Sequence, residues 1–275
     1  ISALSGMVNL TYLHLYNNQI SDITALYGMV NLLYLHLNSN EICDISSLQN
    51  LVNLTYLELG NNQVDSIASF SYNVGIQHLY LYSNNISDIS VLVDMLQLKS
   101  LHLAANNISD IFALNDLTNL RYLNLAYNNI SNIVPLSDMT DMTYLHLANN
   151  EISSITPLEN MFDLQYLYLY SNNITDISSL LGKTSIITLH LYNNNISDIS
   201  ALTTMVNIID LRLNNNNISD ISPLSGRSEL KTLYLNSNQI FDISPLSASV
   251  NLTLLHLFDN QISEIGPLQN LIKLE

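Results

Sequence analysis

One asparagine recurs at a constant interval of 22 residues along the whole chain of 275 residues. No insertion or deletion interrupts the series, so every unit has the same length and the same pattern. A fixed period between about 20 and 50 residues is the signature of a solenoid, in which similar coils stack on one another. The twelve positions are Asn18, Asn40, Asn62, Asn84, Asn106, Asn128, Asn150, Asn172, Asn194, Asn216, Asn238 and Asn260.

A Leu-x-Leu pair precedes each of these asparagines, from Leu13 and Leu15 in the first unit to Leu255 and Leu257 in the last. An alternation with a period of two indicates a short strand with one buried and one exposed face. Equal spacing makes consecutive strands parallel neighbours. The sequence therefore predicts one short strand per unit, all in one parallel sheet.

The residues after each asparagine lead back to the next strand and carry apolar side chains every three positions, as at Ile20, Ile23 and Leu26. This spacing suits a 3₁₀ or extended return better than an α-helix. Because strands about 4.8 Å apart need less room than the returns, the stack should curve with its sheet inside. We predict a right-handed α/β horseshoe with a concave parallel sheet and convex 3₁₀ or extended returns. Five returns carry a proline at one equivalent place, which are Pro135, Pro157, Pro223, Pro245 and Pro267.

The repeats begin at Ile1 and run to Glu275 without a polar capping unit at either end. We predict that residues 1–275 form a single domain of about twelve repeats with no evident caps. An uncapped solenoid would expose the apolar ends of its core to water. We therefore expect this chain to be a segment of a longer protein.

The return sequences NNISDISPL, at residues 216–224, and SNQIFDISPL, at residues 237–246, closely resemble the 22-residue repeats of the internalin family of bacterial surface proteins. The resemblance covers the whole chain and implies a leucine-rich-repeat solenoid. Sds22-type phosphatase regulatory subunits share the repeat length but are less given to the Asp-Ile-x-Pro-Leu return. Internalin-like proteins bind host surface proteins through the concave sheet. The resemblance thus implies an adhesive or receptor-binding role outside the cell or at its surface.

The helical cap, immunoglobulin-like region and wall-anchoring signal of that family do not occur in this sequence. The resemblance therefore specifies the fold, whereas the function must be argued from the residues of the site.

Charge and composition exclude several classes of function. Seven Lys and Arg against 23 Asp and Glu give a formal net charge of −16, which would repel a nucleic-acid backbone. No apolar stretch approaches the roughly 18 residues of a membrane span. The single cysteine, Cys43, excludes an internal disulfide. No Ser/His/Asp or Cys/His arrangement and no glycine-rich phosphate loop occurs, so we expect neither catalysis nor a cofactor.

The variable residues beside the strand leucines should point into the concavity. All seven histidines and thirteen of the sixteen tyrosines lie in three such columns. Tyrosine and histidine combine an apolar body with a polar tip and few rotatable bonds, which suits contact with another surface. Alternatively, adjacent rings only stabilise the sheet, by about 0.2–1 kcal/mol per pair. The predicted partner-binding residues are Tyr12, His14, Tyr34, His36, Tyr56, Glu58, His78, Tyr80, His102, Tyr122, Tyr144, His146, Tyr166, Tyr168, His190, Arg212, Tyr234 and His256.

The predicted face has an area on the order of 700 Å², given the strand spacing, and one partner's share of a standard protein interface is about 800 Å². A protein partner is therefore expected, with carbohydrate stacking on the tyrosines as the alternative. The function predicted is a non-catalytic recognition module. The alternatives are an intracellular scaffold or Sds22-type phosphatase regulatory subunit, and the targeting arm of a larger enzyme. The oligomeric state stays open.

Two sets of residues could bind metal ions. His14, His36 and Glu58 occupy one column on three consecutive units, and such ligands suit zinc or iron, although solvent exposure and the absence of a supporting shell argue against a site. A carboxylate column on the returns could bind calcium, or could accept bonds from turn amides. Its members are Asp22, Asp44, Asp88, Asp110, Asp176, Asp198, Asp220, Asp242 and Glu264.

Three further expectations concern single side chains. The repeated asparagines should bond backbone groups that the turn leaves unpaired, at about 1–3 kcal/mol each. The histidine column should gain charge as the pH falls toward about 6. Four polar residues replace the usual Leu or Met of the return, and we expect their polar ends to reach solvent at the convex rim. These are Asn73, Lys183, Arg227 and Ser249.

Overall fold

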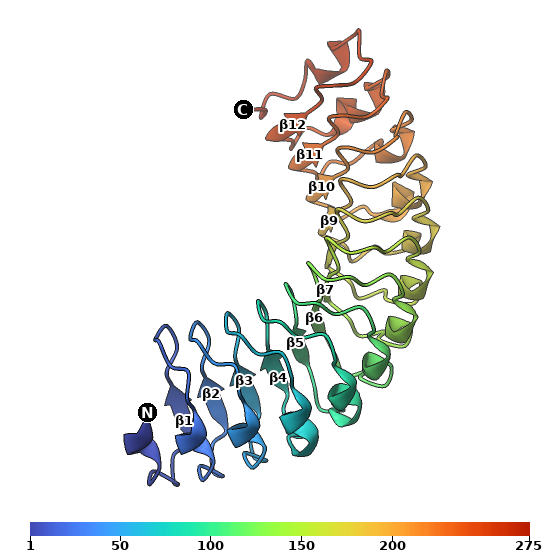
Figure 1. The fold of residues 1–275 in the computed structure, drawn as a ribbon. Coiled ribbons are helices and arrows are strands. Elements are labelled where there is room, and N and C mark those ends of the chain that lie inside the picture. The colour runs from blue at the N-terminus through green and yellow to red at the C-terminus, as the bar shows by residue number, and fades with distance from the viewer. The chain divides into compact units, whose positions relative to one another are not determined.

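A computed structural model describes all of residues 1–275, which divide into two compact units. Unit 1 is Ile1–Met139 and unit 2 is Thr140–Glu275, and each is described by itself. In both units, short strands follow one another on one side and 3₁₀ helices on the opposite side (Figure 1). No helix in the structure combines the length and the apolar character that a membrane span needs.

Unit 1 contains six parallel strands, each paired with the next in sequence order. The register is a constant shift of 22 residues, as in the pairing of Leu13 with Leu35. The strands are β1 (Tyr12–His14), β2 (Tyr34–His36), β3 (Tyr56–Glu58), β4 (His78–Tyr80), β5 (Ser100–His102) and β6 (Tyr122–Asn124). The 3₁₀ helices are η1 (Ser2–Leu4), η2 (Thr24–Leu26), η3 (Ser46–Leu48), η4 (Ala68–Tyr72), η5 (Ser90–Asp94), η6 (Phe112–Leu114) and η7 (Val134–Leu136).

Unit 2 repeats this arrangement with the same register, as in the pairing of Leu145 with Leu167. Its strands are β7 (Tyr144–His146), β8 (Tyr166–Tyr168), β9 (Thr188–His190), β10 (Asp210–Arg212), β11 (Thr232–Tyr234) and β12 (Leu254–His256). Its 3₁₀ helices are η8 (Thr156–Leu158), η9 (Ser178–Leu180), η10 (Ser200–Thr204), η11 (Ser222–Leu224), η12 (Ser244–Ala248) and η13 (Gly266–Leu268). The predicted solenoid of parallel strands and 3₁₀ returns is confirmed.

The core follows directly from the two periodicities of the repeat. In the inner coils, the leucines of the Leu-x-Leu pair, such as Leu35 and Leu37, are 0% exposed, and so are return residues such as Leu26 and Met29. Strand residues on either side of the central leucine point the other way and keep part of their surface. In each unit, one face of the sheet is therefore packed against the returns, and the other is open to solvent.

The side chains of the repeated asparagines bond several backbone groups at once, in two successive coils. In unit 1, Asn106 Nδ2 donates to the carbonyl oxygens of Leu103 in its own coil and Leu81 in the coil before, both at 3.0 Å. Its Oδ1 accepts the backbone N–H of Ile86 at 3.0 Å. The side chain of Asn18 donates to the carbonyl oxygens of Leu15 and Tyr16 in its own coil. Within each unit, ladder asparagines such as Asn106 and Asn172 thus tie two successive coils together.

A residue with positive φ directly precedes every ladder asparagine, with φ between 52° and 58°. The sequence pattern alone did not lead us to predict this turn. The left-handed region is unfavourable for most L-residues and least so for asparagine, which occupies five of the twelve positions. Two residues without that tolerance, Ala105 and Tyr127, occupy the same conformation.

The expectation that four polar return residues reach solvent is wrong. Asn73, Lys183 and Ser249 are 0% exposed and Arg227 is 6% exposed. The coils are packed too closely at this position for a side chain to turn outward. Their polar groups must therefore find partners inside the stack.

Lys183 carries a charge into the core of unit 2 and has no exposed surface. Its Nζ donates to the carbonyl oxygens of Glu159 at 3.0 Å and Met161 at 3.1 Å, and lies 4.7 Å from the centroid of the Phe162 ring. Burial nevertheless lowers the pKa of Lys183 to about 8. The side chain binds the preceding coil instead of loosening it.

Neutral polar residues at the same position are only partly satisfied. Asn73 Nδ2 donates to the carbonyl oxygen of Leu51 at 2.9 Å and, less closely, to that of Leu48 at 3.3 Å. Its Oδ1 and the Oγ of Ser249 are buried without a hydrogen-bond partner. These two coils therefore bury an unsatisfied polar atom at a cost of about 1–3 kcal/mol each.

Candidate partner-binding surface

All of the predicted partner-binding residues are the first or last residue of a strand. They lie on the side of the sheet opposite the buried leucines, which we call the sheet face. Tyr12 is 58% exposed and Tyr166 is 37% exposed, whereas most of the others are only half-buried because neighbouring rings cover them. The sheet face is thus open to solvent but densely packed within itself.

In unit 1 the rings form continuous rows from coil to coil. The rings of Tyr12 and Tyr34 stack with centroids 4.7 Å apart and planes 7° apart, and Tyr34 and Tyr56 follow at 6.0 Å. His14 and His36 lie 4.3 Å apart in the adjacent row. Such contacts contribute to stability by themselves, so ring packing accounts for part of the pattern.

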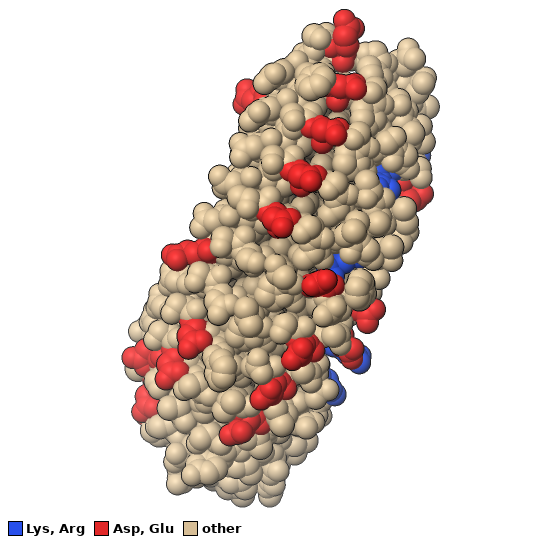
Figure 2. All heavy atoms as spheres, turned by 90° about the vertical axis from the view of Figure 1, so that its right-hand side faces the viewer, with Lys and Arg blue, Asp and Glu red and all other residues tan.

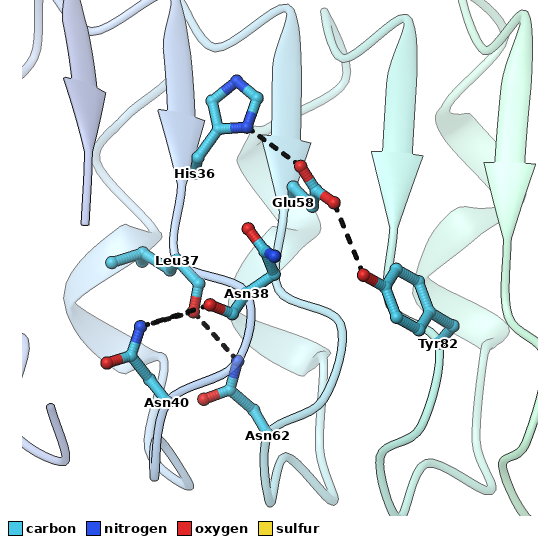
Figure 3. A network of polar contacts seen from close by, with 7 residues as sticks. All are labelled: His36, Leu37, Asn38, Asn40, Glu58, Asn62 and Tyr82. Carbon is cyan, nitrogen blue, oxygen red and sulfur yellow. Dashed lines mark hydrogen bonds and ion pairs between the residues drawn. The ribbon is translucent and has the colours of Figure 1, made fainter. Parts of the chain in front are cut away.

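Glu58 lies among these rings at the end of β3, and its side chain is 20% exposed. Its Oε2 accepts a hydrogen bond from His36 Nδ1 at 2.9 Å, and its Oε1 accepts a longer one from the hydroxyl of Tyr82 at 3.5 Å (Figure 3). Because an ionised carboxylate only accepts, the His36 proton sits on Nδ1. Burial, and then the Glu58 charge, raise the pKa of Tyr56 to about 12.

Two histidines of unit 1 do not follow the expected titration near pH 6. Burial lowers the pKa of His102 to about 4, and burial also lowers the pKa of His78. The ring of His102 is covered by Tyr82 at 4.7 Å and by Tyr80 and Tyr122, each at 6.3 Å between centroids. The close ring packing explains the shift, which the sequence did not indicate.

Unit 2 carries a second cluster of rings. Tyr144 packs against Tyr166 at 6.1 Å and Tyr168 at 5.5 Å, and Tyr168 meets His190 edge-on at 5.0 Å. In the next column, Tyr170 and Tyr192 stack at 4.4 Å with planes 7° apart. In the last two coils, Tyr234 and His256 lie in the same column as Tyr168 and His190, and their ring centroids are 4.2 Å apart.

Arg212 is tied down within the sheet face. Its Nε and Nη2 donate to Oδ1 and Oδ2 of Asp210, both at 3.1 Å, and its guanidinium lies 4.9 Å from the centroid of the Tyr234 ring. His190 Nε2 lies 3.2 Å from the same carboxylate. Burial alone would raise the pKa of Asp210, but the bonds from His190 and Arg212 lower it. The two opposite charges are therefore largely compensated.

The candidate metal ligands are not arranged as a site. His14, His36 and Glu58 share one row, yet no group of three His, Cys, Asp or Glu residues in the structure could hold a metal ion. Instead, His36 is engaged by Glu58, and His14 packs against His36 and Tyr16.

The carboxylate column lies on the return side, where rows of Asp and Glu are visible within each unit (Figure 2). Each bonded aspartate accepts the backbone N–H two residues ahead, at the start of a 3₁₀ helix. Asp44, for example, accepts from Ser46 at 2.8 Å, and this bond lowers the pKa of its carboxyl group. Of the two roles expected for the carboxylate column, calcium binding and acceptance of bonds from turn amides, the structure contains the bonds from turn amides.

Two features escaped sequence reasoning. Gly60, beside Glu58, has a ring of Tyr82 directly over its Cα, and a Cβ at this position would overlap that ring. On the return side of unit 1, a hollow of about 430 Å³ is lined by Asp88, Asp110 and Phe112, and Phe112 is 70% exposed. The Gly60 signal could have been found, because most other coils carry a larger side chain there.

The sequence matches the family described as Leucine Rich repeats (2 copies) over more than half of its length. No curated protein matches the chain by sequence. The matched segments are residues 8–50, 30–72, 118–160, 163–204 and 184–226.

Solved structures give closer relationships. An internalin (InlF) of Listeria monocytogenes matches with a TM-score of 0.92 and 34% identity, over 98% of this chain and 87% of that one. A leucine-rich-repeat protein of Leptospira interrogans matches with a TM-score of 0.91 and 25% identity, over 100% of this chain and 74% of that one.

A plant receptor ectodomain is also similar. The leucine-rich-repeat ectodomain of the Arabidopsis thaliana receptor kinase GASSHO1/SCHENGEN3, solved in complex with CASPARIAN STRIP INTEGRITY FACTOR 2, matches with a TM-score of 0.87 and 27% identity. The match covers 97% of this chain but only 35% of that one. With the repeat, the register and these matches together, the chain belongs to the leucine-rich-repeat family and carries internalin-like repeats.

Proposed function

We propose that the chain is a non-catalytic recognition module that binds a protein partner through its sheet face. The observation that carries this proposal is the concentration of tyrosine and histidine on one open face of both units. The central leucine of each inner strand, such as Leu35 or Leu167, points to the opposite side and is fully buried. Rings with a polar tip, held in place by their neighbours, lose little conformational entropy when a partner binds.

The orientation of the rings favours a protein over a carbohydrate. Stacked pairs such as Tyr12 with Tyr34 and Tyr170 with Tyr192 turn their flat faces toward one another. A sugar stacks on a ring face, and the faces that these paired rings turn toward one another are already covered. The ring edges and hydroxyl groups, which suit a mixed polar and apolar protein surface, remain for a partner.

Similar proteins support a binding role of this kind. The plant receptor ectodomain was solved in complex with CASPARIAN STRIP INTEGRITY FACTOR 2, and an internalin has a similar structure. We propose a surface or secreted adhesin as the biological setting. An intracellular scaffold, an Sds22-type phosphatase regulatory subunit and the targeting arm of a larger enzyme are the alternatives, and the sequence that flanks this segment distinguishes them.

Affinity capture with the intact chain, followed by variants, tests the proposal. We expect capture of the partner to fall at least tenfold for Tyr144→Ser, Tyr166→Ser and Tyr168→Ser combined, or for the equivalent unit 1 triple. That second triple is Tyr12→Ser, Tyr34→Ser and Tyr56→Ser.

The matched control replaces exposed tyrosines outside the sheet face. Tyr27 and Tyr72 are 53% and 69% exposed, so their replacement by serine should leave capture unchanged. Circular dichroism must show that every variant is folded. Unchanged capture by both sheet-face triples would place the binding site elsewhere.

A further inference from the structure

Glu58 is the one carboxylate in its column of the sheet face, where the other coils carry His, Tyr, Asn or Arg. Aromatic side chains surround it. His36 and Tyr82 bond its two oxygens, and the ring of Tyr56 lies 4.7 Å from His36 and 5.4 Å from Tyr80 between centroids. A negative group thus lies among four rings on the sheet face of unit 1, and Figure 3 shows its contacts with two of them, His36 and Tyr82.

Gly60 makes this frame possible. Because it has no side chain, the ring of Tyr82 lies over the backbone of the neighbouring coil and directs its hydroxyl group toward Glu58. Any larger residue at this position would push the ring away. Gly60 provides the space, Tyr82 provides the ring that fills it, and Glu58 provides the carboxylate to which the Tyr82 hydroxyl group is bonded.

The electrostatics of this frame favour a cation. The faces of tyrosine rings carry negative potential, and a carboxylate beside them adds a full negative charge. Besides burial, the Glu58 charge contributes to the raised pKa values of Tyr56, Tyr80 and Tyr82, so all three hydroxyl groups lie within its field. Anions are disfavoured here, and a positive group would relieve the accumulated negative potential.

Asp210 and the aspartates of the return column have partners of a different kind. Asp210 on the sheet face of unit 2 is compensated by the guanidinium of Arg212. Return-side aspartates such as Asp88 accept a backbone N–H and have no rings bonded to them. Glu58 is bonded only by His36 and by the neutral hydroxyl group of Tyr82, and no lysine or arginine compensates its negative charge.

We infer that Glu58, framed by His36, Tyr56, Tyr80 and Tyr82, is the recognition site for a lysine or arginine side chain of the protein partner. This inference rests on the proposed function, because it names what the sheet face of unit 1 recognises. A basic side chain would place its aliphatic stem along the rings and its charged head at the carboxylate. The net charge of −16 would draw a basic partner toward the protein over a longer range.

Short peptides test this site without knowledge of the partner. The probes are Ac-Gly-Lys-Gly-NH₂ and Ac-Gly-Nle-Gly-NH₂, in which norleucine keeps the aliphatic stem and removes the charge. They are titrated into the full chain at millimolar concentrations while NMR follows the rings of His36, Tyr80 and Tyr82. We expect saturable shifts with the lysine peptide only. Equal shifts with both peptides, or none with either, would overturn the inference.

Three variants locate the binding. Glu58→Gln preserves shape and should weaken binding of the lysine peptide at least tenfold. Gly60→Ala should also weaken it, because the ring of Tyr82 must move. Asp88→Asn removes one negative charge from the return side of the same unit and should change binding less than twofold. Asparagine is tolerated at this place in the repeat, because Asn132 occupies the equivalent position two coils later. Equal losses of binding for Glu58→Gln and Asp88→Asn would show that the peptide responds to the net charge of the protein and not to a site at Glu58.

Failure of this site and failure of the proposed function are distinguishable. If the tyrosine triples abolish capture of the partner while the lysine peptide does not bind at Glu58, the sheet face binds proteins without this site. If neither triple affects capture, the proposed function fails whatever the peptides do.

Discussion

The side-chain Oδ1 of Asn128 accepts the backbone N–H of Ile108, one coil earlier, at 2.9 Å. The amide nitrogen of Asn128 donates to the carbonyl oxygens of Leu103 and Leu125, both at 3.0 Å, and the residue is only 8% exposed. Its exposed neighbour Asn129 reaches the same coil only through its backbone N–H. Two adjacent residues of one type therefore have very different structural roles.

We predict that Asn128→Ala lowers the free energy of unfolding by about 1–3 kcal/mol, because it leaves buried backbone groups of two coils without a partner. Asn129→Ala should change it by less than about 0.5 kcal/mol. Denaturant unfolding followed by circular dichroism measures both values. Equal losses for the two variants would contradict the assignment of the ladder.

Lys183 should make stability depend on pH in the alkaline range. Its pKa is about 8 in the folded protein and near its ordinary value of 10.5 when unfolded. Between these values the unfolded state binds more protons, so the contribution of this residue to stability rises as the pH increases from 8 to 10.5. We predict that Lys183→Met raises the free energy of unfolding at pH 7 by roughly 1–3 kcal/mol.

Methionine is the appropriate replacement because Met161 and Met205 occupy the same position in the coils before and after. The advantage of the variant over the unmodified chain should shrink as the pH rises toward 10.5. Parallel denaturation series at several pH values measure that difference and cancel the titration of other groups. A constant difference, or a destabilised variant at pH 7, would show that the hydrogen bonds of Lys183 outweigh its burial cost.

The fold was predictable because the repeat contains both periodicities in every coil. The alternation of Leu35 with Tyr34 and His36 sets which face is buried, and the constant spacing of 22 residues sets the pairing of each strand with the next. Lys183 was misplaced because sequence chemistry favours a solvated ammonium group. Close packing of the neighbouring coils overrides that preference, and the sequence alone does not reveal how close they lie.

The candidate surface was predictable as a set of columns but not as a set of contacts. Register alone places Glu58 between His36 and Tyr80. The turn of the Tyr82 ring over Gly60 depends on a side-chain rotamer and on the absence of a Cβ two residues beyond Glu58. The lowered pKa of His102 likewise depends on rings from two neighbouring coils, and column membership does not indicate it.

Ala105 provides a test of the left-handed turn before the ladder asparagine. Its φ is 56°, a conformation that costs an ordinary L-residue about 1–2 kcal/mol and costs asparagine less. We predict that Ala105→Asn raises the free energy of unfolding by about 0.5–1 kcal/mol. The reciprocal change Asn149→Ala, at a φ of 53°, should lower it by a similar amount. If both variants changed the free energy of unfolding in the same direction, side-chain contacts and not the backbone conformation would control stability at this turn.

The carboxylate column should stabilise the returns through backbone bonds and without calcium. Asp220 Oδ1 accepts the N–H of Ser222 at 2.7 Å and its Oδ2 accepts the Ser222 hydroxyl at 2.9 Å. The backbone bond lowers the pKa of Asp220 below its ordinary value of 3.8. Stability from this group is therefore present above pH 3.8 and is lost as the pH falls through the lower, folded-state value.

We predict that Asp220→Ala lowers the melting temperature at pH 7 and that Asp220→Asn, which keeps the acceptor, lowers it less. Asn132 plays the same role in its own coil by accepting the N–H of Val134 at 3.0 Å. A chelator should leave the melting temperature of the unmodified chain unchanged, and added calcium should not raise it. A rise of the melting temperature with calcium would contradict this prediction. It would mean that the ion bridges the carboxylates of successive coils and offsets their repulsion.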